Sequence, residues 1–85
     1  MKAESARAIY AILVEECRAP QGQEEAFIAA HVNGEPGEWR FKGDLGHGGK
    51  FYSYNKWRGG CYEEDRTPER DAMIERANCR LLEIP

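Results

Sequence analysis

The stretch from Gly43 to Lys50, GDLGHGGK, combines clustered glycines with a lysine, a composition found in phosphate-binding loops. A Walker loop continues after its lysine with serine or threonine and leads into a helix. Here Phe51 follows the lysine, and the residues after it have a strand pattern. We therefore interpret the glycines as residues that permit positive φ angles in a connection between two strands. Any role of the Gly43–Gly49 loop beyond turn geometry is left open.

Residues of zinc-ligand type are present but widely spaced in the chain: Cys17, His31, His47 and Cys61. Zinc sites usually place two ligands within a few residues of each other, and no such pair occurs among these four. The chain has 3 cysteines, an odd number without a C-x-x-C pair, so neither a disulfide framework nor a zinc ribbon is indicated. The sequence predicts no metal and no cofactor.

Nucleophilic catalysis requires a hydroxyl or thiol beside a base, and the hydroxyls outside tyrosine are Ser5, Ser53 and Thr67. Thr67 precedes a proline at the expected start of a helix, where it is explained as a cap. The acidic run Glu63-Glu64-Asp65 has its carboxylates adjacent in sequence, which is typical of a solvated turn rather than of an acid–base pair facing a cleft. We predict that the protein is not an enzyme.

Charge is distributed unevenly along the chain. Residues 1–38 carry three basic and seven acidic residues, residues 39–58 five basic and one acidic, and residues 59–85 four basic and seven acidic. The basic middle segment alternates with aromatic residues, a combination that single-stranded nucleic acid binding uses. The candidate binding residues are Arg40, Lys42, Lys50, Tyr52, Lys56, Arg58 and Tyr62. Ordinary solvation of a strand face and contact with a protein partner are the competing interpretations.

The length of 85 residues fits a single domain spanning residues 1–85. A hydrophobic fraction of 41% and a charged fraction of 32%, with both signs interspersed, are typical of a folded, well-solvated protein. No apolar run approaches the roughly 18 residues of a membrane span. We expect a cytoplasmic protein without membrane contact.

Apolar residues recur at helical spacing in the first third of the chain. Between Ser5 and Arg18 they predict an amphipathic helix that ends before Pro20. A second, shorter helix is predicted from Gln23 to Val32, with Asn33-Gly34 as its stop signal.

After the turn residues 34–37 the pattern changes to a period of two, which predicts three short strands near residues 39–42, 50–53 and 57–62. If Trp39, Phe41 and Phe51 face the helices, six of the candidate binding residues occupy the other face of the sheet, and Lys56 lies in the turn between the second and third strands. The six are Arg40, Lys42, Lys50, Tyr52, Arg58 and Tyr62.

Thr67 and Pro68 predict the start of a last helix, with Glu69 and Asp71 in its first turn. The expected order is therefore ααβββα. It predicts an α+β domain, with a three-stranded antiparallel meander covered on one face by helices. The predicted core comprises Ile9, Leu13, Phe27, Trp39, Phe41, Phe51, Met73, Ile74, Ala77 and Leu81.

A resemblance to a known group of proteins is carried by two strings, FKGDLGHGGKF (Phe41–Phe51) and CYEEDRTPERDAMIERANCRLLE (Cys61–Glu83). They resemble small uncharacterised proteins of proteobacterial phages and prophages, in which a glycine loop between strands precedes a Cys-Tyr strand end and a Thr-Pro-capped helix. The likeness covers roughly the C-terminal half and, more loosely, the first helix. It brings no catalytic residues with it.

The resemblance implies an accessory role, because small phage proteins, anti-CRISPR proteins among them, often bind and block a host defence complex. We expect a non-enzymatic phage or prophage accessory protein that binds and inhibits a bacterial protein or ribonucleoprotein complex in the host cytoplasm. The alternative is a single-stranded nucleic-acid-binding module that uses the basic aromatic sheet face. We disfavour it because the acidic flanks oppose phosphate binding. The partner's identity and the oligomeric state stay open.

Overall fold

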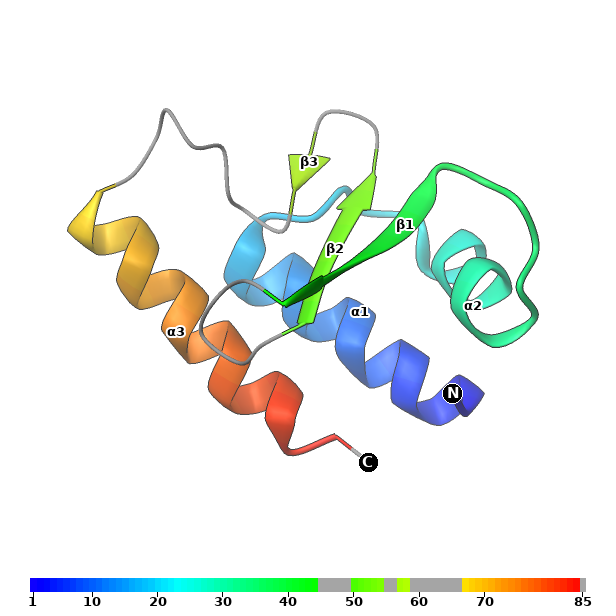
Figure 1. Ribbon diagram of the computed structural model, residues 1–85, viewed down its shortest axis with the longest axis horizontal. Helices are drawn as coiled ribbons and strands as arrows, with labels where there is room; N and C mark the ends of the chain where they lie inside the picture. The colour runs from blue at the N-terminus through cyan, green and yellow to red at the C-terminus, as the bar shows by residue number, and fades with distance from the viewer. Residues whose placement is uncertain (45–49, 55–56, 59–66, 85) are drawn as a thin grey trace.

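The computed structural model describes residues 1–44, 50–54, 57–58 and 67–84, and for residues 41–44, 50–53, 57–58 and 70 it describes the backbone alone. Helices α1 (Ala3–Cys17) and α2 (Glu24–Val32) are followed by strands β1 (Trp39–Asp44), β2 (Lys50–Tyr54) and β3 (Trp57–Arg58), and then by helix α3 (Pro68–Leu82) (Figure 1). None of the helices within these ranges combines the length and the apolar character that crossing a membrane requires.

Helix α1 is the central element of the fold. It packs against α2 on one side and α3 on the other (Figure 1). Its buried residues are Ser5, Ala6, Ile9, Tyr10, Ile12, Leu13 and Cys17. These residues cover a wide arc of the helix, because a helix covered from two sides buries more of its surface than a helix covered from one.

The first two helices end in left-handed backbone, as capped helices often do. Arg18 has a φ of 59°, and the Ala19 amide donates a 3.0 Å hydrogen bond to the Leu13 carbonyl. Gly34 has a φ of 70°, and the Glu35 amide donates to the Ala29 carbonyl at 3.1 Å. The prediction that Asn33-Gly34 stops the second helix is confirmed.

The three strands pair antiparallel in the order β1-β2-β3. Trp39 pairs with Tyr54, Arg40 with Ser53, and Phe41 with Tyr52, after which a bulge shifts the register so that Gly43 pairs with Phe51. Strand β3 pairs with β2 through Ser53 with Arg58 and Tyr54 with Trp57.

The fold class predicted from the sequence, an α+β domain organised by a three-stranded antiparallel meander, is wrong. The described residues are mainly helical, with helices of 15, 9 and 15 residues beside strands of 6, 5 and 2. The main cluster of buried residues comes from the helices and the α1–α2 connection, and Trp39 is its single described strand member. An alternation of apolar and polar residues indicates that strands are present, but it does not show which elements form the core. Here the packing of helices around α1 decides that, and this packing could not be read from the pattern.

Most of the predicted core residues are buried. Ile9, Leu13, Phe27, Trp39, Ile74, Ala77 and Leu81 are each at most 6% exposed. Met73 is half-buried, and the side chains of Phe41 and Phe51 lie outside the described part. Tyr10, at 7% exposed, is buried and was not among the predicted core residues.

Candidate functional site: the outer row of the sheet

Three residues on neighbouring strands form a row across the sheet: Arg40 on β1, Ser53 on β2 and Arg58 on β3. Arg40 pairs with Ser53, and Ser53 pairs with Arg58. Residues paired directly across antiparallel strands belong to the same face of a sheet. Because neighbouring strands lie only about 5 Å apart, this register brings two arginines from distant parts of the segment onto one face. We call these three residues the outer row.

Arg40 is exposed, and its guanidinium is held close to the backbone. Its Nη1 donates hydrogen bonds to the carbonyl oxygen of Gly37 and, at 3.0 Å, to that of Trp39. Arginine has five N–H donors, so these contacts leave most of the guanidinium available to a partner. The side chain is therefore both accessible and restrained where β1 begins.

The register divides the other predicted binding residues between two faces. Phe41 pairs with Tyr52, so position 52 belongs to the row of Trp39 and Tyr54, and by alternation position 50 belongs there too. Lys42 lies at the bulge. Lys56 and Tyr62 lie outside the described residues. The expectation that Lys50 and Tyr52 share a face with Arg40 and Arg58 is wrong, because the phase of β2 is shifted by one residue and such a shift exchanges the faces of a strand.

The row of Trp39 and Tyr54, which we call the inner row, is held in place by aromatic packing. The Trp39 ring lies 4.9 Å from the Phe27 ring and 5.9 Å from the Tyr10 ring, both edge-on, and 4.9 Å from the Tyr54 ring. Aromatic pairs in such geometries stabilise a fold beyond the area they bury. The packing of Trp39 against α1 and α2 therefore directs Arg40, the next residue, away from the helices.

His31 extends this aromatic cluster along α2. Its ring lies 4.4 Å from the Phe27 ring, and its side chain is half-buried. Burial lowers the pKa of His31, because removal from water disfavours the charged imidazolium. His31 therefore lies on the side of α2 that faces the aromatic cluster.

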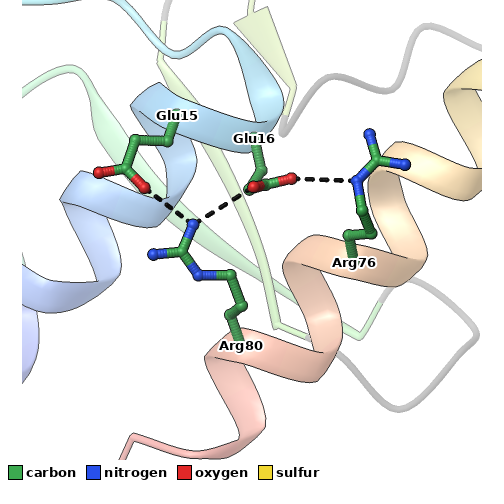
Figure 2. Close-up of polar contacts among 4 residues, drawn as sticks. All are labelled: Glu15, Glu16, Arg76 and Arg80. Atoms are coloured by element: carbon green, nitrogen blue, oxygen red, sulfur yellow. Dashed lines mark hydrogen bonds and ion pairs between the residues drawn. The ribbon is translucent and has the colours of Figure 1, made fainter.

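A second group of charged residues joins α1 to α3 (Figure 2). Arg80 Nη1 lies 2.8 Å from Glu15 Oε2 and 3.3 Å from Glu16 Oε1, and Arg76 Nε lies 3.3 Å from Glu16 Oε2. The hydrogen bond from Arg80 to Glu15 raises the pKa of Arg80. The i, i+4 spacing of the two arginines was visible in the sequence, but their partners are 60 or more residues away and required the fold.

A shallow, open depression of about 510 Å³ lies beside these ion pairs. The residues that line it are Glu16, Ala72, Glu75, Arg76, Cys79 and Arg80. The arginines already contact glutamates, so the depression offers a neutral rim rather than a strongly charged one.

No group of three or more His, Cys, Asp or Glu side chains suited to holding a metal is found in residues 1–44, 50–54, 57–58 and 67–84. The side chain of Cys17 is buried and that of Cys79 is exposed. His47, Cys61 and the acidic run 63–65 lie outside the described residues.

Comparison with known proteins gives no relative: no family model, no curated protein and no solved structure matches the chain.

Proposed function

We propose that the chain is a non-enzymatic accessory protein of the phage or prophage type, which binds and inhibits a bacterial protein or ribonucleoprotein complex. The outer row of the sheet is its contact surface. The observation that carries the proposal is the register that aligns Arg40 with Arg58 through Ser53.

Several features support contact through this row. Arginines are enriched at protein interfaces, because the planar guanidinium binds carboxylates or phosphates through two parallel hydrogen bonds. Arg40 is exposed and its guanidinium is restrained by two backbone carbonyls, so less side-chain entropy is lost when a partner binds. The inner row packs on the helices, so the site rests on a rigid support.

The alternative, binding of single-stranded nucleic acid, has weaker support. It needs aromatic rings on the same face as the basic residues, so that bases stack while the charges follow the backbone. The register assigns Tyr52 to the row of Trp39 rather than to that of Arg40. One of the two rings proposed for stacking is therefore separated from the arginines.

The proposal is tested by capture of partners from bacterial lysate with the tagged chain. We expect one stoichiometric partner, which is lost when Arg40 and Arg58 are both replaced by glutamate. The matched control reverses the charge of Arg7 and Arg18, two exposed arginines of the α1 region, and should retain the partner. Equal loss or equal retention in the two double variants would refute the outer row as the contact surface.

A titration with a short oligonucleotide tests the alternative, which is binding of single-stranded nucleic acid. If phosphates are the ligand, affinity for a short oligonucleotide should be submicromolar and fall steeply with added salt. We expect negligible affinity at physiological salt, because the acidic segments on both sides of the basic segment oppose it.

A further inference from the structure

Helix α3 is attached to the rest of the described fold mainly through α1. It buries one stripe of residues, Ile74, Ala77, Asn78 and Leu81. Cys79 and Arg80, which lie between Asn78 and Leu81 in sequence, are exposed. A helix held through a single stripe can open as a local unit, since among the described residues few other contacts have to break with it.

Asn78 is a polar residue within this buried stripe. It is 4% exposed, and neither its Nδ2 nor its Oδ1 has a hydrogen-bond partner among the residues that the structure describes. A buried amide without partners is unfavourable in the docked state, because water satisfies the same atoms once the helix opens. Asn78 therefore favours the opened state relative to an apolar residue at that position.

The polar contacts that hold α3 on α1 are exposed to solvent. The Arg76 side chain is 62% exposed and that of Arg80 44%, and their glutamate partners are 22% and 58% exposed. Ion pairs at this exposure are weak and are screened by salt.

From these two observations we infer that α3 undocks from α1 as a unit while α1, α2 and Trp39 stay folded. Asn78 lowers the free energy of this opening, and the Glu15, Glu16, Arg76 and Arg80 ion pairs make the opening salt-sensitive. The opened state exposes the apolar positions Ile74, Ala77 and Leu81. The inference concerns the isolated chain and does not depend on the proposed partner.

The test is residue-resolved amide hydrogen exchange on the full chain, comparing α3 with α1. We expect amides of α3 to exchange about tenfold faster or more than the slowest amides of α1. Asn78→Ala should slow exchange in α3 by about tenfold, because it removes the unpartnered amide, and leave α1 unchanged. Equal exchange rates in the two helices would overturn the inference.

Cys79→Ala is the matched control, since cysteine and asparagine have similar helix propensity and residue 79 is exposed. It should slow exchange in α3 by about threefold or less, the effect of helix propensity alone. If it slows exchange as much as Asn78→Ala does, helix propensity explains the effect and the role of Asn78 is refuted.

Salt supplies a second, independent readout. Raising salt to about 1 M should speed exchange in α3 roughly two- to threefold. The Glu15→Gln, Glu16→Gln double variant should abolish that response. A salt response that persists in the double variant would overturn the contribution of the ion pairs.

Discussion

Helix α1 has two junctions that differ in how their polar groups are satisfied. At the junction with α2, the buried hydroxyl of Tyr10 donates to the Pro20 carbonyl at 2.6 Å and accepts from the Gln23 amide at 2.9 Å. At the junction with α3, the buried side-chain amide of Asn78 has no hydrogen-bond partner in the described part of the chain, and the polar contacts there are exposed ion pairs. Both junctions contain buried side chains, so burial alone does not show which of them is more stable. The comparison of the Tyr10 hydroxyl with the Asn78 side-chain amide favours the α2 side.

The aromatic junction should be the most sensitive part of the molecule. Phe27 is fully buried and contacts the rings of Tyr10, His31 and Trp39. Phe27→Ala should lower the free energy of unfolding by about 3–5 kcal/mol, measured by urea denaturation, because it leaves a large cavity. Leu82→Ala, at a site 64% exposed on α3, is the control and should change it by less than about 0.5 kcal/mol. Similar losses in the two variants would contradict the assignment of the core.

The hydroxyl of Tyr10 should be the next most important group. Tyr10→Phe keeps the ring but leaves the backbone N–H of Gln23 and the carbonyl of Pro20 without their partner. It should lower the free energy of unfolding by about 1–3 kcal/mol in the same measurement. Gln23→Ala is the control. The Gln23 side chain makes no capping hydrogen bond, and the variant keeps the backbone amide. A Gln23→Ala effect as large as that of Tyr10→Phe would show that the side chain, not the hydroxyl bridge, holds the α1–α2 connection.

The end of α2 offers a smaller test on the same side of the molecule. Gly34 has a φ of 70°, so Gly34→Ala should destabilise the fold by about 1 kcal/mol although nothing crowds the site. Gly37→Ala, where φ is not positive and the site is equally open, should be close to neutral. Thermal unfolding of the two variants decides the point, and equal melting temperatures would contradict the left-handed cap.

On the α3 side, removal of one charge should lower the melting temperature slightly, and added salt should abolish this effect. Arg80→Gln should lower the melting temperature at low salt and not at about 1 M salt, because its bonds to Glu15 and Glu16 are exposed. Arg7→Gln, an exposed arginine of α1 without an ion pair in the described part, should be neutral at both salt concentrations. An Arg80→Gln effect that persists at high salt would indicate a stronger α1–α3 junction than we infer.

Protonation of His31 should influence the free energy of unfolding only on acidification and not at neutral pH. Because its pKa is lowered in the folded state, the unfolded chain binds a proton more readily. Stability is therefore highest above the ordinary pKa of 6.5 and falls as the pH drops from there toward the lowered value. His31→Gln should flatten this part of the stability–pH profile. An unaltered slope in His31→Gln would contradict the assignment.

Local signals in the sequence predicted the helices well. Pro68 begins α3 as expected, and the Asp71 amide donates to the Thr67 carbonyl at 2.9 Å, where the first turn closes. Such signals work because a helix end is decided by the residues within one turn of it.

Features that depend on partners distant in sequence could not be predicted in the same way. The phase of β2 depends on Tyr54 packing against Trp39, and a choice based on Phe51 alone shifted it by one residue. Likewise, Asn78 gave no signal, because whether a polar residue at helical spacing is satisfied depends on what packs against it. The outer row was predicted only in part, through Arg40 and Arg58.

The unequal strength of the two junctions is tested most directly by urea unfolding of the Trp57→Phe variant, in which Trp39 is the single tryptophan. Far-UV circular dichroism follows all helices, whereas the fluorescence of Trp39 follows the aromatic junction with α1 and α2. We predict that part of the helical signal is lost at lower urea than the Trp39 signal, as α3 undocks first. Coincident transitions with equal midpoints and slopes would contradict the account, because they would mean that the two junctions break together.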